Sequence, residues 1–139
     1  IKTYFLVIAS MQPYADFDRS EPPLISIYFT GAKETDQNFD IYLSELAKNY
    51  EPKVPFSLIF ELSKAPMPQL KYQLKQAAWM KENKSLIQSY CNAVAYVIPS
   101  KLLRGALKFI FSIQNNPVDF KVFSTYEPAK EWALNKARK

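Results

Sequence analysis

Three cations and two phenylalanines in the C-terminal half form the strongest candidate binding surface in the sequence. Lys101, Arg104 and Lys108 are spaced i, i+3 and i+7, so they share one face of a predicted helix. Phe109 and Phe111 lie about 160° apart around the same helix, and a single sheet contact rarely hides two rings placed in this way. We therefore predict an apolar surface with a basic rim, suited to a protein partner or lipid. The alternative is a very hydrophobic core helix whose basic back faces water.

The residue types that most catalytic sites need are missing from the chain. There is no histidine, which removes Ser-His and Cys-His dyads and most zinc sites. The only glycines are Gly31 and Gly105, too few for a phosphate-binding or dinucleotide-binding loop. Lysine or carboxylate catalysis remains chemically open, but no motif indicates it. We therefore expect no enzyme activity, no catalytic residues, no cofactor and no metal site.

Charge is divided unevenly along the chain. Residues 1–70 hold 6 basic and 9 acidic side chains, a net charge of −3, whereas residues 71–139 hold 12 basic and 4 acidic ones, a net charge of +8. The positive charge of residues 71–139 favours an acidic protein or anionic lipid as partner. The simpler explanation of this charge is that the lysines lie on the water-exposed faces of helices. Nucleic-acid binding would rest on charge alone, and we do not expect it.

Composition also bears on location. Cys91 is the only cysteine, so no intrachain disulfide can form, as is typical of a reducing cytoplasm. There is no apolar run of membrane-spanning length and no signal-peptide pattern at the start. We expect a cytoplasmic protein, with a peripheral position at a membrane as the other option.

The segment 54–62 is the predicted centre of the fold. Large side chains at Phe56, Leu58 and Phe60 alternate with smaller ones, but Ile59 makes the other face apolar too. A strand that is apolar on both faces is typical of a parallel sheet covered by helices. We predict an interior strand here, with Phe56 and Phe60 buried.

The remaining elements follow from hydrophobic periodicity and from caps. Strands are predicted at residues 3–9, 24–30, 91–98 and 119–123, and a loop at residues 10–23. A helix capped by Asp36 runs to about Tyr50, one capped by Ser100 covers residues 101–114, and a last helix has Pro128 near its start.

The helix that follows Pro68 is harder to interpret. One side carries Leu70, Leu74, Ala77 and Ala78, and the opposite side carries Tyr72, Trp79, Leu86 and Tyr90. A polar stretch at residues 81–84 interrupts both sides. Either this helix is long and has two partners, or it breaks near Asn83.

Two segments resemble a known family. Residues 122–132, Val-Phe-Ser-Thr-Tyr-Glu-Pro-Ala-Lys-Glu-Trp, resemble the F-s-x-x-x-x-A-x-x-W ending of SpoIIAA-like, or STAS-type, domains. Residues 95–105, Ala-Tyr-Val-Ile-Pro-Ser-Lys-Leu-Leu-Arg-Gly, resemble the strand and next helix start of the same group. The predicted ββαβαβαβα order also matches. The resemblance implies a single SpoIIAA-like α/β domain over residues 1–139, with a mixed, mainly parallel sheet covered by helices.

The same resemblance implies a non-enzymatic regulatory or protein-interaction module with a protein partner or a homodimer. One branch of the family is switched by phosphorylation of a serine in an Asp-Ser-Ser/Thr-Gly motif. Here Ser63 is followed by Lys-Ala-Pro-Met-Pro-Gln-Leu, so the phosphoacceptor motif is absent. Another branch is similar in fold to CRAL-TRIO lipid-transfer proteins, and it implies the alternative, a small lipid- or membrane-surface-binding domain.

Overall fold

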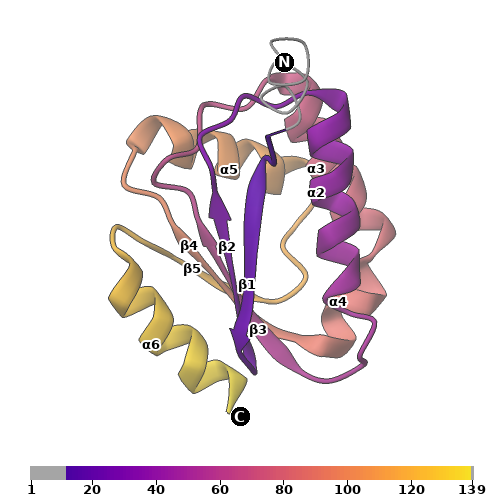
Figure 1. Ribbon diagram of the computed structural model, residues 1–139, viewed down its shortest axis with the longest axis vertical. Coiled ribbons are helices and arrows are strands. Elements are labelled where there is room, and N and C mark those ends of the chain that lie inside the picture. The colour runs from indigo at the N-terminus through magenta and orange to yellow at the C-terminus, as the bar shows by residue number, and fades with distance from the viewer. Residues whose placement is uncertain (1–11, 139) are drawn as a thin grey trace, which may run out of the picture.

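A five-stranded mixed sheet forms the middle layer of the structure, a computed structural model that describes residues 12–138. Its strands lie side by side in chain order: β1 (Ala15–Glu21), β2 (Leu24–Phe29), β3 (Phe56–Glu61), β4 (Cys91–Val97) and β5 (Asp119–Phe123). β1 is antiparallel to β2, and every other neighbouring pair is parallel. The α/β class and the mainly parallel sheet predicted from the sequence are therefore confirmed (Figure 1).

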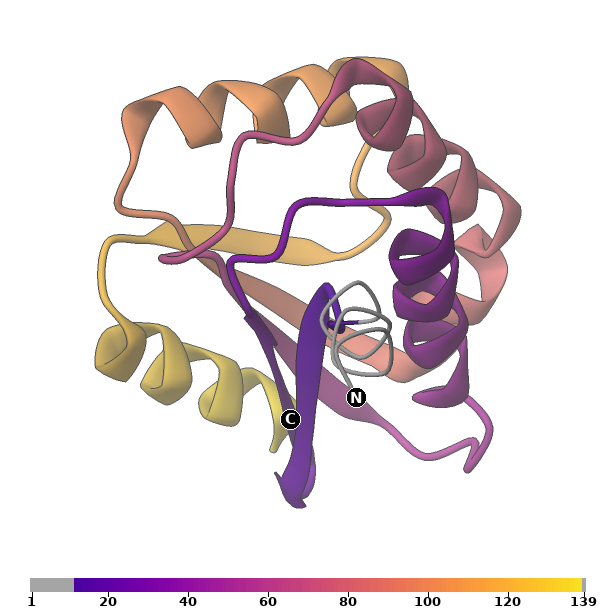
Figure 2. The same ribbon diagram turned by 45° about the horizontal axis from the view of Figure 1, so that its top comes forward.

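Helices cover both faces of this sheet. They are α2 (Asp36–Lys48), α3 (Leu70–Glu82), α4 (Lys84–Tyr90), α5 (Lys101–Ile113) and α6 (Tyr126–Ala137). α6 packs on one face, against β2, β3, β4 and β5, and the other four helices lie on the opposite side (Figures 1 and 2). The layers separate two apolar clusters, a large one under α2, α3 and α5 and a smaller one under α6.

β3 is the central strand, as predicted. Phe56 and Phe60 are 3% and 8% exposed and belong to the large cluster, whereas Ile59 is fully buried in the cluster under α6. Both faces are thus covered, which explains why the apolar pattern of this strand does not simply alternate.

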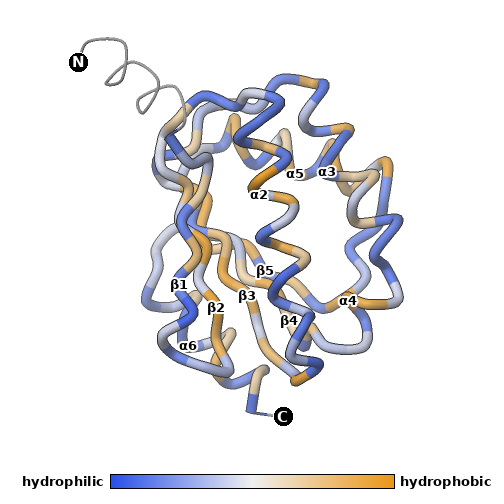
Figure 3. The backbone as a smooth tube through the Cα atoms, turned by 45° about the vertical axis from the view of Figure 1, so that its right-hand side comes forward, coloured by the Kyte–Doolittle hydropathy of each residue, from blue (hydrophilic) through white to orange (hydrophobic). Residues whose placement is uncertain are grey.

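The first strand differs from the prediction. Residues 10–23 were expected to form a loop, but Ala15–Glu21 pairs with β2 as an edge strand. Most of its side chains stay in water, so its sequence is hydrophilic, as the blue tube of β1 in Figure 3 shows. Its backbone pairing and a hydrogen bond from Arg19 Nε to Asn49 Oδ1 at 2.8 Å hold it in place. The strand expected at residues 3–9 lies outside the described residues.

α2 begins at Asp36, one residue earlier than a cap at Asp36 implies. Thr35, not Asp36, is the N-cap: its Oγ1 accepts a hydrogen bond from Asn38 N at 3.0 Å. Asn38 Oδ1 accepts in return from Thr35 N at 2.7 Å, which completes a capping box. The hydrophobic periodicity that predicted this helix is confirmed, since Phe39, Tyr42 and Leu46 are among its buried residues.

The helix after Pro68 breaks at Asn83, one of the two predicted outcomes, because Asn83 separates α3 from α4. Of the two apolar sides noted for this helix, the one with Leu70, Leu74 and Ala78 faces outward: Leu70 and Leu74 are 58% and 45% exposed, and Ala78 is exposed as well, whereas Ala77 is buried. The physical reason is that α3 contacts α2 and α5 rather than the strands, and so turns its other side inward. Its buried residues are Tyr72, Ala77 and Met80.

Candidate functional site

The predicted binding helix forms as expected. Ser100 is the N-cap of α5, and its Oγ accepts a hydrogen bond from Leu103 N at 3.3 Å. Leu103, Ala106 and Ile110 form the buried side of the helix. The backbone of α5 lies beside α3, and side chains of α5 such as Phe111 extend to Tyr96 of β4 and Phe120 of β5. Two long flanks of the helix therefore remain available for contacts.

One flank of α5 faces β5 and forms a groove, here called the basic groove. Its volume is about 750 Å³. α5 contributes Lys101, Arg104, Gly105, Leu107, Lys108, Phe111 and Ser112, and β5 contributes Phe120 and Val122. The rings of Phe111 and Phe120 have their centroids 4.8 Å apart and supply a continuous apolar floor. Phe120 is 44% exposed, so this floor is open to a partner.

The rim of the basic groove is cationic. Lys101 and Lys108 are exposed, and within residues 12–138 neither takes part in an ion pair. No aspartate or glutamate lines the groove. Because exposed positive charges without nearby carboxylates create a positive potential, the rim attracts anionic groups.

Arg104 has a different role from the two lysines. Its Nε donates a hydrogen bond to Ile98 O at 2.8 Å, and its Nη2 donates to Ser124 Oγ at 3.0 Å. These bonds connect the first turn of α5 to the segments that follow β4 and β5. Arg104 is therefore a positioning residue that fixes the helix beside β5, and it also adds positive charge to the rim.

The structure brings together four of the five predicted site residues and separates the fifth. Lys101, Arg104, Lys108 and Phe111 line the groove, but Phe109 lies on the opposite flank of α5. Phe109 is 40% exposed there, in an apolar stripe with Leu102 and Ile113, which are 75% and 47% exposed. The helix thus carries two distinct surfaces, a basic groove and an apolar stripe.

The sequence interpretation missed the contribution of β5. Phe120 and Val122 alternate along a short strand, so their spacing could have placed them on one face. Nothing in the sequence indicated that this face would meet α5. In the described chain β5 pairs only with β4, so its outer edge keeps unpaired backbone groups beside the groove.

The other residues considered from the sequence occupy structural positions. Ser63 N donates to Glu61 Oε1 at 2.9 Å in a turn after β3. Trp79 and Trp132 are partly buried against the apolar clusters. Cys91 is 3% exposed, and burial raises the pKa of its thiol to about 12, so the thiol is inert at neutral pH.

Comparison with known proteins adds no identification: no protein family, curated protein or solved structure matches the chain. Within residues 12–138, no cluster of three or more histidine, cysteine, aspartate or glutamate side chains could hold a metal ion. Among the described helices, none has the length and apolar character required to cross a membrane.

Proposed function

We propose that the chain is a non-enzymatic interaction module of the SpoIIAA-like, or STAS-type, kind, and that it binds an acidic, extended segment of a partner protein in the basic groove. The observation that carries the proposal is the groove itself: exposed cations without carboxylates surround an apolar floor next to the open edge of β5. The described elements follow the order expected for the family from β2 onward, apart from the split second helix, but the strand before β2 is residues 15–21 and not the expected residues 3–9.

Extended backbone is the conformation that this site favours. A segment that pairs with the outer edge of β5 gains main-chain hydrogen bonds, and every second side chain points toward α5. Apolar side chains among these contact Phe111 and Phe120, and acidic ones reach Lys101 and Lys108. The partner sequence therefore alternates, with acidic and apolar residues on one side of the strand.

Gly105 agrees with a close approach of partner backbone to α5. Glycine in a helix interior costs roughly 0.5–1 kcal/mol relative to alanine. A Cβ built at Gly105 meets no atom within 4 Å, so no packing inside the chain requires glycine there. The position lines the basic groove, where a missing side chain leaves room for a bound segment.

Replacing Gly105 with alanine is therefore expected to separate stability from binding. The free energy of unfolding of the Gly105→Ala protein should be about 0.5–1 kcal/mol higher than that of the unchanged protein. Alanine reduces the conformational freedom of the unfolded chain, and its Cβ meets no atom in the folded one. Its affinity for a groove-binding peptide should fall, because the added methyl group narrows the site. Urea unfolding and peptide titration measure the two effects. A variant that is more stable and binds equally well would show that the space at Gly105 is not used.

The proposal is tested by selecting peptides from a random library displayed on phage, with the whole chain as bait. Acidic–apolar alternating sequences should be enriched. In titrations by fluorescence anisotropy, the double variant Lys101→Glu and Lys108→Glu should lose about tenfold in affinity or more, because each exposed charge pair contributes up to about 1 kcal/mol. Binding by the unchanged protein should also weaken as salt rises.

The matched control is the double variant Lys81→Glu and Lys84→Glu, which makes the same charge change around the break between α3 and α4, away from the groove. This control should bind selected peptides almost as well as the unchanged protein. Enrichment of neutral or basic peptides, or equal losses in the two double variants, would overturn the proposal.

A second candidate function, binding to a lipid surface, is favoured by the apolar flank of α5. Among residues 12–138, six of the nine exposed large hydrophobic residues lie on α5 or around the start of α3: Met67, Leu70, Leu74, Leu102, Phe109 and Ile113. Cosedimentation with vesicles of anionic and of neutral lipid tests it. Binding that is lost in Leu102→Ser and Phe109→Ser, but kept in the groove variants, would establish this candidate. Loss of a dimer in the same two variants, measured as mass in solution, would instead indicate self-association.

A further inference from the structure

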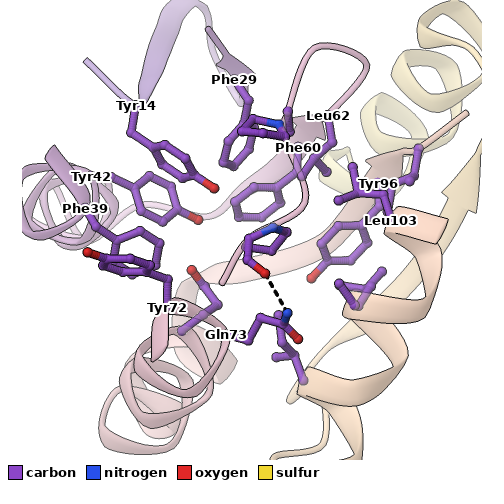
Figure 4. A pocket seen from close by; sticks show the side chains of 18 of the residues that line it. Tyr14, Phe29, Phe39, Tyr42, Phe60, Leu62, Tyr72, Gln73, Tyr96 and Leu103 are labelled. Carbon is purple, nitrogen blue, oxygen red and sulfur yellow. Dashed lines mark hydrogen bonds between the residues drawn. The ribbon is translucent and has the colours of Figure 1, made fainter. Parts of the chain in front are cut away.

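A second concave site lies on the inner side of α5, between the sheet and helices α2, α3 and α5 (Figure 4). Aromatic rings from the strands and helices supply much of its wall, among them Tyr14, Phe29, Tyr42, Phe60 and Tyr96. We call it the aromatic cavity. The cavity forms because the backbone of α5 lies beside α3 and at some distance from the strands. Only side chains occupy the space between α5 and the strands, and they do not fill it completely.

The size of the aromatic cavity corresponds to a small organic molecule. The volume of the cavity is about 80 Å³. One water needs roughly 10–15 Å³ by this measure, so the cavity has the room of on the order of five waters or one single-ring compound. The apolar walls around a space of this size offer dispersion contacts to a ligand that fills it.

The polarity of the wall restricts the ligand further. Among the described residues, no lysine, arginine, aspartate or glutamate lines the cavity, so a charged group would enter without a partner at a high desolvation cost. The hydroxyls of Tyr14 and Tyr42 point toward its centre, beside the ring of Phe60 (Figure 4). Burial is the main cause that raises the pKa of both tyrosines well above the usual range, so both hydroxyls stay protonated and neutral.

Two glutamines line the cavity, and the side chain of one of them already makes a hydrogen bond within the protein. Gln73 Nε2 donates a hydrogen bond to Pro68 O at 2.8 Å and thereby holds the connection between β3 and α3. Gln76 lies near Tyr42 and partly offsets the rise in its pKa. The amide of Gln76 and the two tyrosine hydroxyls thus form a neutral polar end within an otherwise apolar wall.

We propose that the aromatic cavity binds a small, uncharged, mainly apolar molecule of single-ring size that carries one hydrogen-bonding group. The ring lies among the aromatic side chains, and its polar group meets the hydroxyls of Tyr14 and Tyr42. Entry is from the side of Pro66, Pro68 and Leu107, which are lining residues that are not fully buried. This inference goes beyond partner binding in the groove. Its polar contacts come from Tyr14 and Tyr42, which do not line the groove, whereas Leu107 and Phe111 line both sites.

Three probes of similar size and different polarity test the proposal on the whole chain: toluene, phenol and benzoate. Thermal-shift titration should show that phenol binds more tightly than toluene and that benzoate binds at least about tenfold more weakly than phenol, because its charge finds no partner. In the double variant Tyr14→Phe and Tyr42→Phe, phenol should lose roughly two- to tenfold in affinity, as expected for lost hydrogen bonds, while toluene binds as before.

The position of the probe is tested with Ala106→Leu, since Ala106 lines the cavity from α5 and is 8% exposed. This change should abolish binding of all neutral probes, whereas Ala78→Leu, on the exposed side of α3, should leave binding unchanged. Nuclear Overhauser contacts from phenol to the methyl groups of Leu103 and Ile110 locate the probe in the unchanged protein, even where a variant fails to fold. Absence of binding by toluene and phenol, benzoate binding as tight as phenol, or contacts elsewhere would each overturn the proposal.

Discussion

Replacing Phe60 with alanine is expected to lower the free energy of unfolding by about 3–5 kcal/mol, the range for truncation of a buried phenylalanine. Phe60 is 8% exposed in the central strand. Its ring stacks on Tyr96 with centroids 5.3 Å apart, and it also contacts Phe29 at 6.2 Å. Because Phe60 already borders the aromatic cavity, its removal enlarges an existing space that the surroundings do not fill. The cost should therefore lie toward the upper end of that range.

Urea denaturation followed by circular dichroism measures this loss. Phe109→Ala is the matched control, because Phe109 is 40% exposed on the outer flank of α5 and its truncation opens no internal space. The control should cost much less than the truncation of Phe60. Equal costs for the two variants would contradict the central position of β3.

Replacing Ala133 with leucine is expected to destabilise the protein by about 1–3 kcal/mol through overpacking. Ala129 and Ala133 of α6 are fully buried against the sheet, where Ile59 and Ala95 are fully buried as well. Alanines at this contact let the helix lie close to the strands. A leucine at position 133 must displace either α6 or a strand, since close-packed interiors have no spare volume there.

The same substitution at an exposed alanine separates overpacking from the effect of leucine on helix stability. Ala78→Leu on the outer side of α3 should change the free energy of unfolding by less than about 0.5 kcal/mol. Thermal unfolding followed by calorimetry gives both values. If Ala133→Leu is as stable as the unchanged protein, α6 does not pack on the sheet as closely as described.

The elements of the fold were predictable where the physical signal is local. The both-sided apolar pattern of β3 identified the central strand, and Ser100 marked the start of α5. β1 escaped detection because it is an edge strand. Its side chains remain in water, so hydrophobic periodicity carries no information about it, and only backbone pairing with β2 makes it a strand.

The candidate sites were predictable only in part, because they depend on how elements meet. The helical spacing of Lys101, Arg104 and Lys108 correctly placed three cations together. The same periodicity showed that Phe109 and Phe111 diverge, but it could not tell which ring faces β5. The aromatic cavity had no sequence signal at all, since it results from the position of α5 beside α3, which depends on how distant elements meet.

Two side chains of α5 belong to both sites. Leu107 and Phe111 line the basic groove on one side and the aromatic cavity on the other. A rotamer change in either therefore alters both surfaces at once. If an occupant of the cavity selects one rotamer of Phe111, it changes the affinity of the groove by some factor, and by thermodynamic reciprocity a segment in the groove changes the affinity of the cavity by the same factor. If both sites bind as proposed, this wall of single side chains would couple a small molecule in the cavity to a partner segment in the groove, a heterotropic effect built from two residues of α5.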